Sequence, residues 1–376
     1  MASNNTYEQE RELYKSQMNV LPNYVQDYIE YKSRKLSSAT LRAYVIDFID
    51  FFTWIKEIKT FGEFQHISLI PLSVLEQLRS DMIERKYLTY LNNAHRDRIR
   101  AMKTRKKRTV NDMKSTSINR KLSSLKSLFY WLSNIAEDEN LKPLLNRNVM
   151  AKIELDKIKT NIKTKAQALE GKILIGDQID DFIRFIRDEY PNKINSKLAV
   201  KKYNENVERD IAIVSLILSA GLRIAEVSNL DLSDLDLAEE KVYVLRKGEK
   251  EQFVPFSSIA KKNIQHYLEI RNVRYNSPKD EQALFLTKQQ QPYGVRMTKR
   301  AMQLMIEKYA KAFGKPMLSA HKLRHSMATR HYQKNKDIAS LKDHLGHESI
   351  ETTMIYTHVL SSDQKDKIEY AERGED

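Results

Sequence analysis

Apolar residues recur every three or four positions along most of the chain, which is the spacing of an amphipathic helix. The clearest run follows Ser37-Ser38-Ala39-Thr40, which supplies a helix cap, and predicts a helix to about residue 58. Similar runs predict helices at 23–36, 74–91 and 115–132. The first half of the chain is therefore expected to be all-helical. The apolar positions of the clearest run are Leu41, Tyr44, Phe48, Phe51, Phe52 and Ile55.

One stretch departs from the helical pattern. Residues 240–256 read as two short strands, KVYVL and EQFVPF, around the turn Lys247-Gly248-Glu249-Lys250. Helices are predicted on both sides, at 179–189, 204–219, 259–273 and 298–313. The fold class expected is mostly α with a small β-hairpin or sheet (α+β), in which the turn carries Lys247 outward.

The length and charge of the chain indicate how many domains it has and what kind of partner it binds. A chain of 376 residues is too long for one compact core, so two domains are expected. Its net charge of +14 favours a polyanionic partner, nucleic acid before membrane. The absence of cysteine excludes disulfides and thiolate metal sites. The polar N-terminus does not fit a secretory signal, and no apolar run approaches the roughly 18 residues of a membrane span. A cytoplasmic protein is expected.

The most basic segment joins the third and fourth predicted helices. Residues 85–126 hold 14 Lys or Arg and two acids, Asp97 and Asp112. Its densest part is Arg105-Lys106-Lys107-Arg108. A solvated loop is one interpretation of such a run. Contact with DNA phosphates is the other, and it suits a domain that holds DNA.

The stretch 321–356 carries the residues that suggest chemistry. His321 and Arg324 are three residues apart, so one helical turn puts them on the same face. Leu345-Gly346-His347 and Tyr356 follow. An arginine fork grips two phosphate oxygens, a helix N-terminus favours an anion, and a phenol oxygen can attack phosphorus. The combination indicates phosphate chemistry.

This pattern resembles the C-terminal signature of the tyrosine recombinases, the phage integrase and Xer family. Upstream, Ser219-Ala220-Gly221-Leu222-Arg223-Ile224-Ala225-Glu226 resembles the box that holds the family's first arginine, and Lys247 stands where the family has a lysine on a β-hairpin. Further stretches resemble the single-protein Xer recombinases, and they include Pro71-Leu72-Ser73-Val74-Leu75-Glu76 and Asn206-Val207-Glu208-Arg209-Asp210. The resemblance implies the catalytic residues Arg223, Lys247, His321, Arg324, His347 and Tyr356.

The expected mechanism combines that resemblance with phosphate chemistry. Arg223 and Arg324 would offset charge on the non-bridging oxygens, assisted by His321 and His347. A free phenol has a pKa of about 10, so Tyr356 must lose its proton as it attacks, and His321 is a reasonable acceptor. The resemblance assigns protonation of the leaving 5′ oxygen to Lys247. It implies a 3′-phosphotyrosine intermediate and a Holliday junction, with no metal or other cofactor.

Each of these residues also has an ordinary structural interpretation. Glu226 is a plausible local partner for Arg223, and His325, His331, His344 and His358 are expected to be structural. A zinc site is the competing chemistry for the histidines. His321-x3-His325 has the helical spacing of a ligand pair, and His344-x2-His347 could complete it. Such a site would give Tyr356 and Arg223 no role.

The resemblance also implies a domain plan, a two-domain clamp around DNA. The expected parts are an N-terminal extension at 1–20, a helical core-binding DNA-binding domain at 21–150, a basic linker at 151–172, a tyrosine recombinase catalytic domain at 173–360, and a tail for subunit contact at 361–376.

Three function classes stay open at this point. The first is a Xer-type recombinase that resolves chromosome dimers at cell division. The second is the same enzyme integrating or excising a mobile element. The third is a basic DNA-binding protein without catalysis. The partners implied are double-stranded DNA with an inverted-repeat site, a homotetramer on two such sites, and a division-associated DNA translocase of FtsK type. No membrane partner is expected.

Overall fold

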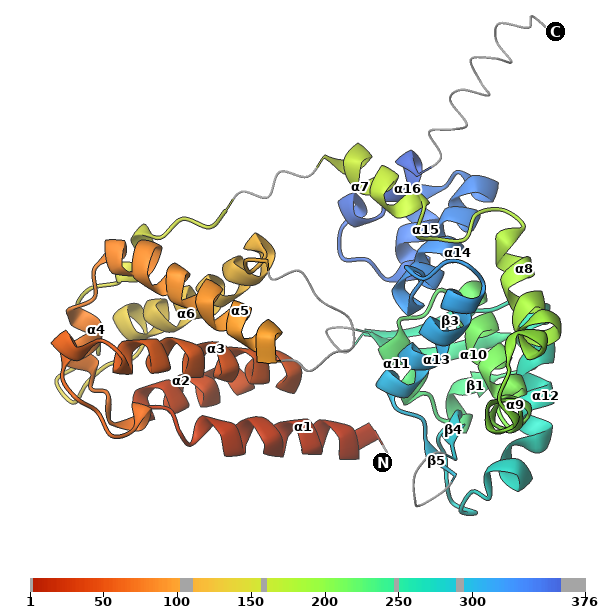
Figure 1. The fold of residues 1–376 in the computed structure, drawn as a ribbon, viewed down its shortest axis with the longest axis horizontal. Coiled ribbons are helices and arrows are strands. Elements are labelled where there is room, and N and C mark those ends of the chain that lie inside the picture. Colours follow the sequence, from red (N-terminus) through yellow and green to blue (C-terminus); the bar gives the residue numbers. More distant parts are fainter. Residues whose placement is uncertain (1–2, 102–110, 157–160, 247–249, 289–293, 360–376) are drawn as a thin grey trace, which may run out of the picture. The chain divides into compact units, whose positions relative to one another are not determined.

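The structure is a computed structural model that describes residues 3–101, 111–156, 161–246, 250–288 and 294–359 (Figure 1). The chain divides into two compact units, Met1–Lys159 and Thr160–Asp376. Each unit has a hydrophobic core of its own. No helix among the described residues is long and apolar enough to cross a membrane.

The first unit is helical, as its periodicity predicted. Ser37 begins the longest predicted run, and its side chain accepts a hydrogen bond from the Thr40 amide at 3.3 Å. Such a cap satisfies one of the amides that a helix start leaves free. The α-helices of this unit are α1 (Ser3–Met18), α2 (Asn23–Ser33), α3 (Ser38–Lys56), α4 (Leu72–Glu76), α5 (Leu88–Ala101) and α6 (Ser115–Asn134).

A buried ion network ties α3 to α6 inside this core. Asp47 of α3 is fully buried and accepts two hydrogen bonds from Arg120, at 2.6 and 2.7 Å. Lys121, also buried, donates to Asp47 at 2.9 Å and to Asp50 at 2.7 Å. Charges buried together in this way hold one another, because removal of either partner leaves the other without compensation.

Two predictions in this unit were incomplete. Residues 1–20 were expected to be an extension, but α1 lies there and its Tyr14 and Met18 are buried in the core. The helix predicted at 74–91 is interrupted after α4. The carbonyl of Leu78 accepts a hydrogen bond from Arg147 at 2.9 Å, so a residue distant in sequence takes the place of a helical partner. Periodicity alone cannot detect such a contact.

The second unit contains the predicted strand pair. Strands β2 (Lys241–Arg246) and β3 (Lys250–Pro255) are antiparallel, with Arg246 opposite Lys250. Strand β1 (Leu235–Asp236) completes a sheet of order β1-β2-β3. A second small sheet pairs β4 (Leu286–Thr287) with β5 (Val295–Arg296). The α-helices are α7 (Ile162–Glu170), α8 (Gln178–Arg184), α9 (Lys197–Asn204), α10 (Val207–Ala220), α11 (Ile224–Asn229), α12 (Ser258–Tyr275), α13 (Lys299–Ala312), α14 (Ala320–Asn335), α15 (Ile338–Leu345) and α16 (Ile355–His358).

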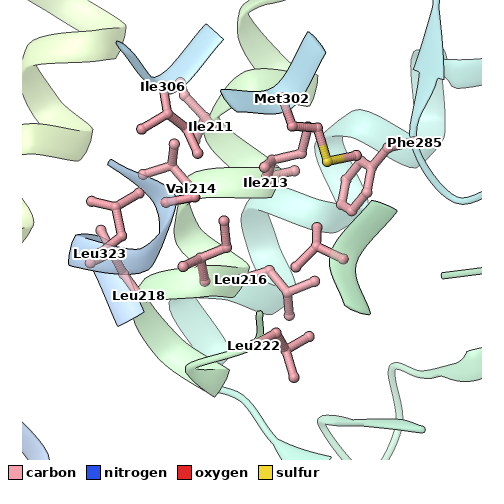
Figure 2. Packing of buried hydrophobic residues seen from close by; sticks show 14 of the residues in the cluster. Ile211, Ile213, Val214, Leu216, Leu218, Leu222, Phe285, Met302, Ile306 and Leu323 are labelled. Atoms are coloured by element: carbon pink, nitrogen blue, oxygen red, sulfur yellow. The ribbon is translucent and has the colours of Figure 1, made fainter. Parts of the chain in front are cut away.

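Helix α10 forms the centre of this unit and packs against α12 and α14 (Figure 1). Nearly every side chain between Arg209 and Ala220 is buried, which explains why the sequence there is apolar on all sides. Figure 2 shows Ile211, Val214 and Leu218 of α10 among side chains from neighbouring elements. Gly221 ends the helix with a left-handed backbone (φ 64°), and a Cβ there would lie 2.0 Å from the Met327 side chain. A side chain there would be strained, because L residues rarely adopt this backbone conformation and the Met327 methyl group would have to move.

Part of the expected linker 151–172 is a helix of the second unit. Asn161 caps α7 by accepting from the Lys163 amide at 3.1 Å. Ala166 and Leu169 of α7 are buried against Val359. The sequence suggested no core face here, because two small or apolar positions in nine residues are too few to produce a visible period. The expected tail 361–376 lies outside the described residues.

The buried ion network generates a stability prediction. Replacing Asp47 with asparagine should lower the free energy of unfolding of the first unit by about 3 kcal/mol, because Lys121 stays buried with half its compensation removed. Both tryptophans of the chain, Trp54 and Trp131, lie in this unit, so urea unfolding followed by tryptophan fluorescence reports on it. The control is Asp81→Asn, which breaks the exposed pair with Arg79 and should leave the midpoint in place. Equal effects of the two changes would contradict the prediction.

Candidate active site

Arg324 lies near the start of α14, and its side chain is 2% exposed. It donates to the carbonyl of Gly221 at 2.5 Å and to the carbonyl of Leu345 at 2.6 Å. Gly221 follows α10 and Leu345 is the last residue of α15. Helix C-terminal carbonyls carry partial negative charge, which stabilises a cation. Arg324 is thus fixed between the ends of two helices.

Arg223 stands two residues after Gly221, at the N-terminal cap of α11. The Glu226 carboxylate accepts from the Arg223 amide at 2.7 Å and from its guanidinium at 2.8 Å. The local ion pair that the sequence suggested is therefore present. The same carboxylate lies 3.9 Å from the Arg324 guanidinium. Because the Arg223 side chain is 39% exposed, it keeps donors for a ligand.

The Leu345-Gly346-His347 box forms the turn that ends α15. Gly346 has a left-handed backbone (φ 61°), and a Cβ there would lie 2.5 to 2.8 Å from the Arg246 side chain. Glycine is needed on both grounds. His347 comes next, and its Nδ1 lies 2.9 Å from the Thr353 hydroxyl. That contact orients the ring and leaves Nε2 for a ligand.

Tyr356 lies on the short helix α16 and is 1% exposed. Its hydroxyl lies 2.8 Å from Nδ1 of His325, which belongs to α14. The His325 ring is in turn in edge contact with the His321 ring, with centroids 4.4 Å apart. His325 had been expected to be structural, whereas it is the histidine that reaches the phenol. Its spacing of four residues from His321 puts both on one helix face, and this was the signal that could have found it.

Burial sets the protonation states in this site. It raises the pKa of the Tyr356 phenol to about 12, although Arg324 and Arg223 act against it. Burial also lowers the pKa of His325 to about 3 and that of His347 to about 4, and it lowers the pKa of His321. At neutral pH the phenol is therefore protonated and the imidazoles are neutral, so each ring keeps one nitrogen that can accept a hydrogen bond.

The site carries more positive than negative charge. Burial, and after it the neighbouring Arg223, lowers the pKa of Arg324 to about 10. Arg246 of β2 is a second buried guanidinium, and burial lowers its pKa, with Glu226 acting against this shift and Arg223 adding to it. Three guanidinium groups thus lie within the electrostatic influence of one carboxylate, Glu226, which pairs with Arg223 at 2.8 Å and lies 3.9 Å from Arg324. An anion placed among them would relieve their repulsion, so the arrangement suits a phosphate.

Five of the six candidate residues meet in this one site: Arg223, His321, Arg324, His347 and Tyr356. The sixth, Lys247, lies outside the described residues, as do Arg105, Lys106, Lys107 and Arg108. In the described part of the chain, no three His, Asp or Glu side chains are grouped as metal ligands. His344, a ligand of the competing zinc hypothesis, instead places Nε2 3.1 Å from the Ala220 carbonyl.

The chain is similar to known proteins over most of its length. Residues 184–363 match the model of the phage integrase family. The chain is 35% identical over 352 residues to tyrosine recombinase XerS of Streptococcus sanguinis, covering 93% of this chain and 95% of the relative, and equally identical over 353 residues to XerS of Streptococcus pneumoniae. A crystal structure of the XerH site-specific recombinase bound to palindromic difH substrate shares the fold, with a TM-score of 0.63, 18% identity, and coverage of 91% of this chain and 82% of that chain.

The chain therefore belongs to the tyrosine recombinases, a family of site-specific DNA recombinases. Within that family it is XerS-like, and the two-domain fold with a helical first unit is that of recombinases solved on DNA.

The buried histidines generate a prediction for stability against pH. Burial lowers the pKa of His344 to about 4. Between about pH 6.5 and 4 the unfolded chain binds a proton that folded His344 does not, so its contribution to stability is present above pH 6.5 and is lost toward pH 4, by up to about 1.4 kcal/mol per pH unit. His344→Gln should therefore flatten the fall in unfolding free energy over this range.

The measurement is urea unfolding followed by circular dichroism at several pH values between about 7 and 4.5. His66→Gln removes an exposed histidine of the first unit and serves as the control. An unchanged pH dependence in His344→Gln would show that this histidine does not contribute to it.

Proposed function

We propose that Tyr356 is the nucleophile of a DNA strand-transfer reaction that proceeds through a 3′-phosphotyrosine. The proposal is supported by the position of the phenol, which shares one site with Arg324 and Arg223. Both guanidinium groups there favour the ionised form of the phenol and so oppose the rise of its pKa. A bond forms between the Tyr356 oxygen and phosphorus, and the bond from phosphorus to the 5′ oxygen breaks. Arg223, Arg324 and the two histidines His321 and His347 stabilise the charge that develops on the non-bridging oxygens.

Two protons move in this reaction. The phenol proton goes to His325, which already contacts the hydroxyl at 2.8 Å, with His321 next to it. In the free protein the low pKa of His325 opposes this transfer. A bound phosphate adds negative charge beside the imidazoles and raises their pKa. DNA binding therefore favours transfer of the phenol proton to His325. Lys247 supplies the proton for the leaving 5′ oxygen. The phosphotyrosine retains the energy of the broken bond, so rejoining needs no cofactor.

We further propose the Xer role, in which the enzyme resolves chromosome dimers at cell division by way of a Holliday junction. The support is identity of 35% with XerS proteins over nearly the whole chain. The Tn1549 transposon integrase, at 16% identity and a TM-score of 0.54, shares the fold alone and gives the mobile-element role no equal support.

The partners follow from the reaction. Each active site holds one attacking tyrosine and cuts one strand, whereas exchange between two duplexes needs four cuts. We propose a homotetramer on two DNA sites with inverted repeats, with the tail 361–376 as the subunit contact and a division-associated DNA translocase as a further partner. Chromosomal DNA as substrate implies work in the cytoplasm.

The nucleophile has a direct test. Tyr356→Phe removes one oxygen and should abolish covalent adducts on a nicked cognate duplex, because nothing remains to attack phosphorus, while binding of that duplex stays the same. Denaturing gels report the adduct and gel shifts report binding. Tyr332→Phe changes another tyrosine that packs in the same small cluster and should keep full adduct yield. An adduct formed by Tyr356→Phe would assign the attack to another residue.

The basic segment has a separate test. We propose that Arg105, Lys106, Lys107 and Arg108 contact DNA phosphates. Changing all four to glutamine should weaken binding to cognate and unrelated duplexes alike, and it should reduce the slope of log affinity against log salt by up to roughly 0.9 for each lost contact. Titrations at several salt concentrations measure this slope. An unchanged slope would make the segment a solvated loop.

A further inference from the structure

The short helix α16 carries the proposed nucleophile but is too short to be stable by itself. It spans Ile355–His358, and a helix of this length is marginal in water without packing. Val359, directly after it, keeps a helical backbone (φ −65°, ψ −19°). Tyr356 and Val359 are three residues apart, and both are buried. The position of the phenol therefore depends on what these side chains pack against.

Tyr356 and Val359 pack into two different hydrophobic clusters. Tyr356 belongs to a cluster formed with α14 and α15, whereas Val359 belongs to a cluster with Ala166 and Leu169 of α7. Ile355 packs against both clusters. Helices α7 and α16 therefore lie side by side (Figure 1). The packing of Ala166 and Leu169 with Val359 and Ile355 is called the α7–α16 contact below.

Helix α7 is fixed at its C-terminal end to the elements that build the active site. The Leu174 amide donates to the Ser326 hydroxyl of α14 at 2.8 Å, and Lys315 Nζ donates to the Ile173 carbonyl at 2.8 Å. Ser326 directly follows His325 in the chain. Because Ile173 and Leu174 are fully buried, these bonds are shielded from water. Helix α7 therefore has a fixed place relative to α14 and can support α16.

The phenol has limited support apart from this contact. Among the described residues, the Tyr356 hydroxyl makes one hydrogen bond, with Nδ1 of His325 at 2.8 Å. His325 is the proposed acceptor of the phenol proton, so a shift of α16 would disturb both the attack and the proton transfer. Reacting atoms must approach within about 3.5 Å, and a misplacement of about 1 Å can cost about 100-fold in rate. Small movements of α16 are therefore expected to matter.

We propose that Leu169 is a positioning residue for Tyr356, which holds α16 so that the phenol oxygen stays within reach of His325 and of phosphorus. Leu169 is 3% exposed, so it acts through the side chains of the α7–α16 contact and does not touch DNA itself. Ala166 is fully buried in the same contact, where its small side chain lets the two helices approach closely. This inference rests on the proposed function, in which Tyr356 attacks phosphorus.

The first test measures the covalent step with DNA already bound. In single-turnover reactions with saturating protein on a nicked cognate duplex, Leu169→Ala should slow adduct formation by about 10- to 100-fold, because the loosened helix displaces the phenol oxygen. The affinity for the duplex, measured by gel shift, should change by less than about twofold, since the leucine contributes to the covalent step and not to binding.

Leu284→Ala is the matched control. It removes the same kind of buried side chain from the core around α10, outside the α7–α16 contact. At a temperature where circular dichroism shows both variants folded, Leu284→Ala should keep the rate of adduct formation of the unchanged protein. Leu169→Met refills the volume beside Val359 and should restore most of the rate that Leu169→Ala loses.

Fluorine NMR reports on the phenol without any reaction. A fluorotyrosine placed at position 356 has a chemical shift that reflects its buried surroundings. Leu169→Ala should move this signal toward that of free fluorotyrosine and make it more sensitive to a soluble paramagnetic agent, because the phenol becomes exposed to water. Leu284→Ala should leave the signal in place. A leucine that serves stability alone would not produce this difference.

A second variant disturbs the same contact by the opposite change in volume. Ala166→Val places a bulkier side chain at a fully buried position, so it forces α7 and α16 apart. It should show the same loss of rate and the same movement of the fluorine signal. It also provides a folded variant in case Leu169→Ala is unstable.

The outcomes separate this inference from the function beneath it. Equal slowing by Leu169→Ala and Leu284→Ala would reduce Leu169 to a residue of general stability. An unchanged rate in Leu169→Ala would show that α14 and α15 alone hold the phenol, and a faster rate would show that α7 restrains it. Each of these results overturns the positioning role and leaves Tyr356 as nucleophile. Absence of any adduct in the unchanged protein would instead remove the proposed function, while the fluorine signal would still report whether α7 holds the phenol.

Discussion

The carbonyl of Leu345 is the contact on which the active site depends. Leu345 is the last residue of α15, and its carbonyl oxygen accepts hydrogen bonds from both Arg324 and Arg246. Burying two guanidinium groups costs free energy, and most neutral hydrogen-bond partners offset that cost poorly. The carbonyls at a helix C-terminus offset it better, because they carry partial negative charge. The fold thus uses the end of a helix, with the Gly221 carbonyl opposite, to keep Arg324 charged and fixed in a buried position.

Because backbone carbonyls hold the guanidinium groups, the site keeps a net positive charge that favours binding of an anion. Glu226 is the carboxylate that pairs with Arg223, lies 3.9 Å from Arg324 and acts electrostatically on Arg246, and burial lowers the pKa of Arg324 to about 10. A second carboxylate would neutralise the site and also block it. Backbone carbonyls fix the guanidinium geometry without adding full negative charge, so the attraction for phosphate is retained. The same positive surroundings act against the burial that raises the pKa of Tyr356.

The sequence predicts correctly those features that depend on neighbouring residues in the chain. It does not predict features that depend on contacts between residues distant in sequence. The long helices α3, α6, α10, α12 and α13 and the strand pair β2–β3 follow from periodicity, because a buried face repeats its spacing. His321, Arg324 and the Gly346 turn could be placed because one helix and one cap set their geometry. Arg246 was missed, although its inward position follows from strand alternation, since a solvated arginine is the usual expectation beside a turn. The helix α7 was missed because two buried positions make no visible period.

The position of α7 explains how Tyr356, the proposed nucleophile, is held. Helix α16 has four residues, too few to be stable by itself. It is held through side chains, since Val359 packs with Ala166 and Leu169 of α7, and Ile355 adds to the same cluster. The hydroxyl of Tyr356 is then directed by His325 of α14. Residues that were expected to form a linker therefore pack against the short helix that carries Tyr356. A tyrosine on so short a helix gains its position from neighbouring elements rather than from its own backbone, and such a segment can shift without unfolding the core around α10.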